Sequence, residues 1–361
     1  HLHRGRGTIR EDLAAFETII GHADAKRLLA RALQSGREPH AFLFVGPSGV
    51  GKTAVASAYC RALLCEGRTG CGECSSCKRL GSGSHPDFVR IYPGQRVDPD
   101  DKGEAIQIKA VRRLVLPRVT VGPAIGDLVA VLIQQAERMT WGAANALLKT
   151  LEEPPEWMRL VLTASASDAV PPTILSRCTL VAFGQVSHQE LQEGLARLFG
   201  ATEEVAKDVA FLAAGSPGRA IALLEDPDAR DRARRMAEFV GDLAKATRAE
   251  ALSIAERLQE AASSQGSGEE LSARAALAES LAHLAQCFRD AAALRLRADP
   301  LSLAVPMAQD ALRRLSERAP AGHWCACAEQ ALEARNRVLG NASARYQLDA
   351  LLTSVVAGLG D

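Results

Sequence analysis

The sequence has no long apolar run, few aromatic residues and no excess of charge of either sign. Aromatic side chains make up 4% of the 361 residues, and 43 Lys and Arg balance 43 Asp and Glu. This balance excludes a chain that coats nucleic acid through its overall charge, so a contact with DNA requires a local basic patch. No run approaches the roughly 18 apolar residues of a membrane helix, and residues 1–6 lack the apolar region of a signal peptide. We expect a soluble, cytoplasmic protein with no membrane partner.

The chain is long, rich in apolar residues and contains several cysteines. At 361 residues it is too long for one compact domain and indicates two or three. Hydrophobic residues make up 47% of the chain, enough for sizeable cores. Inside a cell, the nine cysteines indicate metal ligands or buried thiols rather than disulfides.

The strongest motif is Gly-Pro-Ser-Gly-Val-Gly-Lys-Thr at 46–53, a complete match to the P-loop pattern G-x-x-x-x-G-K-[ST]. An apolar run at 41–45 predicts a buried strand before it, and the Ala- and Leu-rich segment 53–64 predicts a helix after it. In this arrangement backbone N–H groups bind phosphate oxygens, the lysine reaches the β and γ phosphates, and the threonine binds Mg²⁺. The sequence therefore predicts binding of ATP or ADP with Mg²⁺ by Gly46, Pro47, Ser48, Gly49, Val50, Gly51, Lys52 and Thr53.

Four cysteines follow the P-loop helix at the spacing C-x5-C-x2-C-x2-C, among glycines and serines. Four thiolates complete a tetrahedral structural zinc site, and the glycines allow the tight turns that bring them to one ion. The alternative, a flexible loop of unligated thiols, would expose reactive cysteines without benefit. We predict a structural Zn²⁺ in an insertion at 65–77, bound by Cys65, Cys71, Cys74 and Cys77, with Cys60 in the core.

The apolar run at 128–133 is expected to be a strand that, in P-loop ATPases of this layout, ends in acidic residues. Those carboxylates hold the metal and activate the attacking water. Gln134 and Gln135 stand in their place. An amide is neutral and is not a base near neutral pH, so we expect the chain's own ATPase activity to be weak or absent. Glu137 could contribute charge but is expected in the following loop or helix.

The remaining pattern predicts alternating strands and helices up to residue 185. Strands are expected at 86–92, 159–163 and 180–183, and helices at 24–35, 106–116 and 141–153, the last ended by two prolines. With the P-loop, this alternation predicts a doubly wound parallel sheet. One face of the helix expected at 106–116 carries three basic residues, Lys109, Arg112 and Arg113. Three basic residues at this spacing usually form a solvent-exposed helix face.

Beyond residue 185 only helices are expected. Ser187 and Glu190 form a capping box, and helices at 203–213 and from 215–219 onward complete a small three-helix domain. From about 228 the chain is Ala-rich, with breaks at 263–268, Pro300, Pro320 and Gly340. Apolar stripes typical of a bundle core, or of a surface that meets other subunits, are Leu277, Leu281, Leu284 and Phe288, and Leu348, Leu352, Val355 and Leu359. His323, Cys325 and Cys327 do not converge on a metal at helical spacing and are interpreted as core.

The sequence resembles the delta-prime subunits of the bacterial DNA polymerase III clamp loader and, more distantly, the gamma/tau motor subunits. The likeness covers about residues 16–225. It rests on the P-loop, the four cysteines, Ile20-Gly21-His22, His40-Ala41, the string from Ala144 to Pro154, and Thr173-Ile174-Leu175-Ser176-Arg177-Cys178. The resemblance implies an α/β AAA+ nucleotide-binding domain at 1–185, a helical lid at 186–227 and an all-α collar at 228–361 that seals a five-subunit ring.

The resemblance also implies roles for particular residues. Arg177 would supply an arginine finger to ATP on a neighbouring subunit, although a salt bridge is the ordinary interpretation of such a residue. Arg219 would be a sensor arginine for the subunit's own nucleotide. Lys109, Arg112 and Arg113 would grip duplex phosphates. Delta-prime ATPase sites are often degenerate, which fits Gln134 and Gln135.

Three functions remain open at this point. The favoured one is a largely stationary delta-prime-type subunit of the DNA polymerase III holoenzyme. It would work with gamma/tau and delta subunits to load the sliding clamp onto primer-template DNA. The first alternative is a gamma/tau-type ATPase motor, and the second is an unrelated P-loop kinase, for which no acid–base constellation is found.

Overall fold

The computed structural model describes residues 13–98, 105–213, 215–245, 270–297, 309–340 and 342–358. The chain divides into two compact units, His1–Val186 and Ser187–Asp361. The division into three domains, with boundaries after residues 185 and 227, stays a prediction. None of the helices in the described ranges combines the length and the apolar character that crossing a bilayer requires.

In the residues that the structure describes, the first unit contains one sheet of five parallel strands in the order β2-β3-β4-β1-β5. β1 lies inside the sheet between β4 and β5, where Phe42 is opposite Val161 on one side and Thr179 on the other. Such strands are buried on both faces and therefore read as continuous apolar runs. The predicted parallel sheet is confirmed, with β1 Ala41–Val45, β2 Phe88–Ile91, β3 Val129–Ile133, β4 Met158–Ala164 and β5 Thr179–Ala182.

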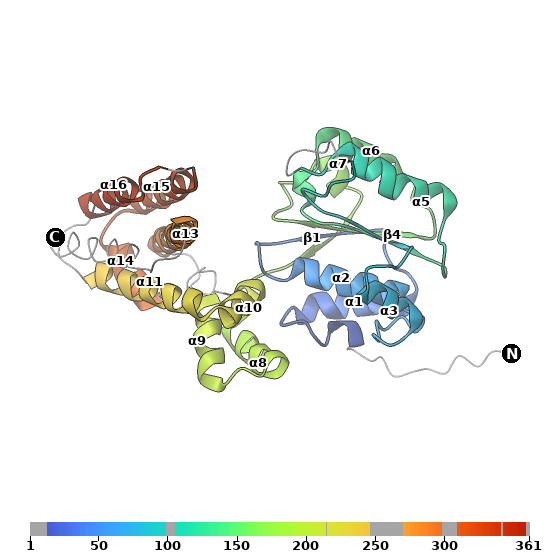
Figure 1. The fold of residues 1–361 in the computed structure, drawn as a ribbon, viewed down its shortest axis with the longest axis horizontal. Coiled ribbons are helices and arrows are strands. Elements are labelled where there is room, and N and C mark those ends of the chain that lie inside the picture. The colour runs from blue at the N-terminus through green and yellow to red at the C-terminus, as the bar shows by residue number, and fades with distance from the viewer. Residues whose placement is uncertain are drawn as a thin grey trace. The chain divides into compact units, whose positions relative to one another are not determined.

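Helices cover both faces of this sheet (Figure 1). Successive side chains of a strand point to opposite faces, so Phe42 and Phe44 enter one core while Leu43 and Val45 enter the other. The first core contains residues of η1 Ala14–Phe16, α1 Ala23–Ser35 and α2 Lys52–Leu64, and α3 Ser75–Gly81 lies on the same side. The opposite face is covered by α4 Ile108–Ala110, η2 Val111–Val115, α5 Leu116–Val121, α6 Trp141–Glu152 and α7 Pro172–Leu175.

Two helical segments of the first unit differ from the prediction. The sequence does not predict α3, because its first residues, a cysteine and two serines, belong to the predicted metal-binding insertion at 65–77. The helix expected at 106–116 begins at Ile108 and continues to Val121, with a π-helical stretch, η2, in the middle. The predicted helix ended at Leu116. The next residue, Pro117, lies in the first turn of α5, where its missing N–H costs nothing.

The second unit is helical throughout its described residues. Ser187 caps α8, and its hydroxyl and the Glu190 side chain form the predicted capping box. The segments are α8 His188–Phe199, α9 Glu203–Ala213, α10 Pro217–Glu225, α11 Pro227–Lys245, α13 Glu270–Arg295, α14 Gln309–Glu317, α15 Ala321–Leu339 and α16 Ala344–Ala357. The breaks predicted at 263–268 and at Pro300 lie outside the described residues.

One apolar core joins α11 and α13 to α16 in this unit. Phe288 of α13 stacks on Trp324 of α15 with ring centroids 5.7 Å apart. The predicted stripes belong to this core at Leu277, Leu281, Leu284, Phe288, Leu348, Leu352 and Val355, while Leu359 lies outside the described residues. Cys327 is buried as predicted, but the interpretation of Cys325 as core is wrong. It is exposed, because two residues along a helix turn a side chain to nearly the opposite face.

Candidate functional site

The P-loop lies between the carboxyl end of β1 and the first turn of α2, where the motif predicts it. Gly46 and Gly51 have φ angles of 153° and 110°. A Cβ atom on Gly46 would also lie 2.1 Å from the Phe183 carbonyl oxygen, so a side chain there is excluded by both backbone and space. The first N–H groups of α2 have no carbonyl partner within the helix, which makes this helix end suited to phosphate. Thr53 lies in that first turn and is half-buried.

Lys52 is folded back over its own loop. Its Nζ donates to the carbonyl oxygens of Gly46 at 2.5 Å and Pro47 at 2.7 Å. Burial lowers the pKa of Lys52, and the nearby carboxylate of Glu137 acts in the opposite direction by raising it. Binding of a nucleotide therefore requires the ammonium to exchange two backbone carbonyls for phosphate oxygens.

His22 holds the P-loop from outside the motif. Its Nε2 donates to the Val50 carbonyl oxygen at 2.6 Å, in the tautomer that carries the proton on Nε2. The ring packs edge-on against Phe183 with centroids 4.9 Å apart. No role for His22 is predicted from the sequence, where its one signal is its place in Ile20-Gly21-His22.

Gln134 and Gln135 follow β3 directly, and neither side chain can act as a carboxylate. Gln134 is buried, and its amide oxygen accepts from Arg90 Nε at 2.8 Å and Nη2 at 3.0 Å in the orientation that satisfies both groups. Gln135 is exposed with a left-handed backbone, and its N–H donates to Thr163 Oγ1 at 3.1 Å. Glu137 lies beyond the strand, as predicted, in the short 3₁₀ helix η3 Ala136–Arg138.

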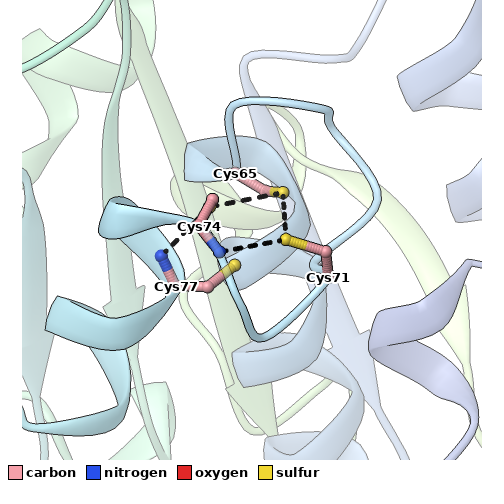
Figure 2. Close-up of side chains that lie close together, drawn as sticks. All are labelled: Cys65, Cys71, Cys74 and Cys77. Carbon is pink, nitrogen blue, oxygen red and sulfur yellow. Dashed lines mark hydrogen bonds between the residues drawn. The ribbon is translucent and has the colours of Figure 1, made fainter.

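The four cysteines converge on one point (Figure 2). Cys65 ends α2, Cys71 lies in the loop, Cys74 caps α3 and Cys77 lies in its first turn. All four sulfur atoms lie within 4.8 Å of one another. The Cys65 sulfur lies 3.7 Å from that of Cys71 and 3.9 Å from that of Cys74. A tetrahedron with Zn–S bonds of about 2.3 Å has sulfur atoms about 3.8 Å apart, so the cluster fits zinc.

Backbone N–H groups also point at these sulfur atoms. The N–H of Cys74 donates to the Cys71 sulfur and that of Cys77 to the Cys74 sulfur, each at 3.4 Å. Burial raises the pKa of Cys65, but N–H groups of four loop residues outweigh burial and bring it to about 6. Donors of this kind favour thiolate, which is the form that binds metal.

A buried carboxylate ties the cysteine loop to the sheet. Arg68, in the loop, pairs with Glu38, whose side chain is 2% exposed. Arg159 of β4 lies 3.7 Å from the same carboxylate. Because Arg68 and Arg159 share this one buried carboxylate, the loop and the sheet are expected to be coupled in stability.

Arg177 lies in the turn between α7 and β5 and forms an ion pair. Its Nη2 is 2.7 Å from Glu152 Oε1 at the end of α6, and its Nη1 donates to the Thr173 carbonyl oxygen at 2.8 Å. These residues border an open cavity of about 650 Å³ that His40 and Cys178 also line. Arg177 thus forms the salt bridge before the last strand that is the ordinary interpretation of such a residue. Both side chains of the pair are accessible to solvent.

Arg219 lies at the start of α10, and its guanidinium contacts α13. It donates to His283 Nδ1 at 3.1 Å and to Gln286 Oε1 at 3.3 Å. Burial, and then the charge of Arg219, lower the pKa of His283 to about 3, so the imidazole is neutral and accepts this hydrogen bond. No sequence signal pointed to His283, because its partner is 64 positions away along the chain.

Acid is expected to destabilise the second unit through His283. The unfolded imidazole titrates at about 6.5, so the unfolded chain takes up the proton first as the pH falls. The contribution of His283 to the free energy of unfolding is fully present above pH 6.5. As the pH falls from there to about 3, the free energy of unfolding decreases by up to about 1.4 kcal/mol per pH unit. Urea unfolding of the full chain between pH 7 and 5 should show this slope, and His283→Gln should flatten it. An equal slope in both proteins would contradict the assignment.

Of the three basic residues Lys109, Arg112 and Arg113, the structure brings two, Lys109 and Arg113, to the same carboxylate. Lys109 Nζ lies 3.4 Å from the Asp98 carboxylate, and Arg113 pairs with the same carboxylate and donates to the Val97 carbonyl oxygen at 3.1 Å. Arg112 is exposed, and the wider π turn of η2 changes the angular spacing that an α-helix would give it. The contact with DNA stays a prediction.

Residues 21–187 match the family model described as DNA polymerase III, delta subunit. The chain is 36% identical over 182 residues to the DNA polymerase III subunit delta-prime of Pseudomonas aeruginosa, an alignment that covers 49% of this chain and 53% of that protein. It is 33% identical over 206 residues to the delta-prime subunit of Escherichia coli, with 56% and 59% covered. The Escherichia coli tau subunit is 36% identical over 166 residues, with 45% and 24% covered.

The chain thus spans somewhat more than half of these delta-prime relatives and about a quarter of tau. Among solved structures, a gamma subunit-related protein of Thermotoga maritima is similar at 16% identity and a TM-score of 0.39, with 91% of this chain and 99% of that chain covered. The family model and the delta-prime and tau relatives agree, and residues 21–187 of this chain form a domain that matches the family of DNA polymerase III delta subunits.

Proposed function

We propose that this chain is a delta-prime-type clamp-loader subunit that binds nucleotide but hydrolyses it slowly, and that it activates the ATPase site of a neighbour. One observation carries the proposal: β3 is followed by Gln134, whose amide is buried against Arg90, in a chain with a complete P-loop. A site of this kind retains the phosphate-binding groups and has lost the two carboxylates expected after the strand. Slow turnover follows for the isolated chain.

The second element of the proposal is Arg177. A guanidinium is always charged and donates two parallel hydrogen bonds, which suits the charge that develops on a transferred phosphoryl group. Arg177 is partly exposed, with 33% of its side chain accessible, and its ion pair with Glu152 opens to a cavity. In a ring, Arg177 would exchange Glu152 for the γ phosphate of ATP on the adjacent subunit.

The remaining roles follow from this placement in a ring. The partners would be gamma/tau and delta subunits in a five-subunit complex, the sliding clamp and primer-template DNA, and the complex would act in the cytoplasm. Residues 186–227 would form the lid and 228–361 the collar. Zn²⁺ would be structural, and Lys109, Arg112 and Arg113 would contact DNA phosphates. As a sensor, Arg219 would have to exchange its contacts on α13 for a phosphate oxygen.

Binding and hydrolysis should separate in the isolated chain. We expect it to bind ADP and ATP with Mg²⁺, because the P-loop and Lys52 are in place. Turnover should be slow, because Gln134 and Gln135 supply no base. Calorimetric titration with ADP and a steady-state ATPase assay test both halves. Lys52→Ala, which removes the ammonium that reaches the phosphates, serves as the control and should abolish binding.

The assay also separates the alternatives. Robust turnover by the chain alone, stimulated by clamp and primed DNA, would favour a gamma/tau-type motor over the delta-prime assignment. Transfer of phosphate to a small molecule, rather than to water, would favour the P-loop kinase. Two observations argue against the kinase. The relatives are DNA polymerase III subunits, and the glutamines that follow β3 cannot act as a catalytic acid or base.

A further inference from the structure

One oxygen of the Glu137 carboxylate is buried and has no hydrogen-bond partner. The other, Oε1, accepts from the Ser165 N–H at 3.1 Å. Oε2 is shielded from solvent and has no hydrogen bond. A buried carboxylate oxygen left in this state costs free energy, and such groups in native proteins usually have a function or bind an ion or water. A bound ion or water at Glu137 Oε2 would satisfy this oxygen.

The position of Glu137 indicates which ligand this is. Ser165 directly follows β4, and the carbonyl oxygen of Ala164, the last residue of that strand, accepts from the Gly46 N–H at 3.3 Å. Two hydrogen bonds thus connect the Glu137 carboxylate to the first residue of the P-loop. The same carboxylate acts electrostatically on Lys52, the residue that reaches the β and γ phosphates.

Neither Gln134 nor Gln135 can supply a carboxylate to a metal at the P-loop. Both are neutral amides, and Gln134 is directed at Arg90 while the backbone of Gln135 is tied to Thr163. Mg²⁺ bound with a nucleotide is typically held by one or two carboxylates together with phosphate oxygens and waters. Thr53 offers a hydroxyl, so the site lacks only a carboxylate.

We propose that Glu137 supplies this carboxylate and holds the Mg²⁺ of a nucleotide bound at the P-loop, in place of the acidic residues absent at Gln134 and Gln135. The proposal rests on the proposed binding of nucleotide. Glu137 would act on the metal and its waters, not as the base for hydrolysis, so slow turnover is unchanged. It makes the affinity for nucleotide depend on Mg²⁺.

The test is titration of the full chain with ADP, in Mg²⁺ and in EDTA. ADP is not hydrolysed, so turnover does not enter the measurement. Wild-type protein should bind ADP more tightly in Mg²⁺. Glu137→Gln keeps the size of the side chain and should bind ADP in EDTA at least as tightly, because a negative charge near the phosphates is gone. Its gain in Mg²⁺ should be smaller by about 10–100-fold, the usual loss when a group that supports a metal is removed.

Two further variants make the result specific. Asp168→Asn removes an exposed carboxylate three residues beyond Ser165 and should behave as wild type. Glu137→Asp keeps the charge and should retain part of the gain, which also covers the case of a poorly folded Glu137→Gln protein. Equal gains in wild type and Glu137→Gln would overturn the role of Glu137. Failure of wild type to bind ADP in either condition would overturn nucleotide binding itself, and this inference with it.

Discussion

Replacement of Arg177 by Ala is expected to lower ATP turnover at the adjacent motor subunit by about 10³-fold or more, because arginine fingers contribute roughly 10³–10⁵ in phosphoryl transfer. The chain itself should remain folded and able to join the complex. The contacts it loses are the exposed ion pair with Glu152 and hydrogen bonds to the Thr173 carbonyl oxygen and the Ser176 hydroxyl, so the structural cost should be small. Loading of the clamp should slow in parallel.

The measurement is DNA-stimulated ATPase and clamp loading by a reconstituted complex in which only this subunit is altered. Arg177→Lys should be nearly as defective, since an ammonium cannot reproduce the two parallel hydrogen bonds. Glu152→Gln breaks the ion pair without touching the guanidinium and should leave turnover intact, and Glu153→Gln is its matched control. If turnover and loading are unchanged in Arg177→Ala, the residue has only the salt-bridge role.

Replacement of Cys74 by Ser is expected to abolish tight zinc binding and to destabilise the first unit. Cys74 contributes one of the four sulfur atoms, so the variant loses one of four thiolates, while a serine can still cap α3. Structural zinc contributes an apparent ~10–16 kcal/mol in zinc-finger peptides, although here the surrounding domain also orders the loop. Loosening of the loop should also withdraw Arg68 from the buried Glu38 carboxylate.

Elemental analysis should find one zinc per chain in wild type and less in Cys74→Ser, and thermal unfolding should show a lower transition for the variant. Cys325→Ser, which removes an exposed cysteine of the second unit, is the control and should match wild type. Reduced, freshly purified wild-type protein without zinc would contradict the metal site. Binding of ADP should survive in Cys74→Ser at a temperature at which the domain is folded, because Lys52 and Thr53 are not in the cysteine loop.

The sheet and the two motifs could be predicted because each depends on residues close together in the chain. Parallel strands such as β1 and β3 are short apolar runs, the P-loop is eight consecutive residues, and the four cysteines lie within 13 positions, 65–77. The continuation from Leu116 to Val121 was not predicted. It contains a proline, a residue that can end one helix or lie in the first turn of another.

The partners of the site residues could not be predicted, because they come from distant segments. His22 contacts Val50 across 28 positions, and Arg177 meets Glu152 across 25. Glu137 was recognised as a charge near the site, but its unpaired oxygen depends on how η3 turns after β3. Sequence spacing carries no information about such contacts. Glu137 and the P-loop follow the carboxyl ends of β3 and β1, whereas Glu152 and Arg177 precede the amino ends of β4 and β5.

The most direct test of the account compares two substitutions in this subunit alone, Lys52→Ala and Arg177→Ala, within the reconstituted complex. Lys52→Ala disables the chain's own phosphate site, and Arg177→Ala disables the group offered to its neighbour. We predict that DNA-stimulated ATPase stays close to wild type with Lys52→Ala and falls sharply with Arg177→Ala. The reverse result, a large loss with Lys52→Ala and none with Arg177→Ala, would show that this chain is itself a motor.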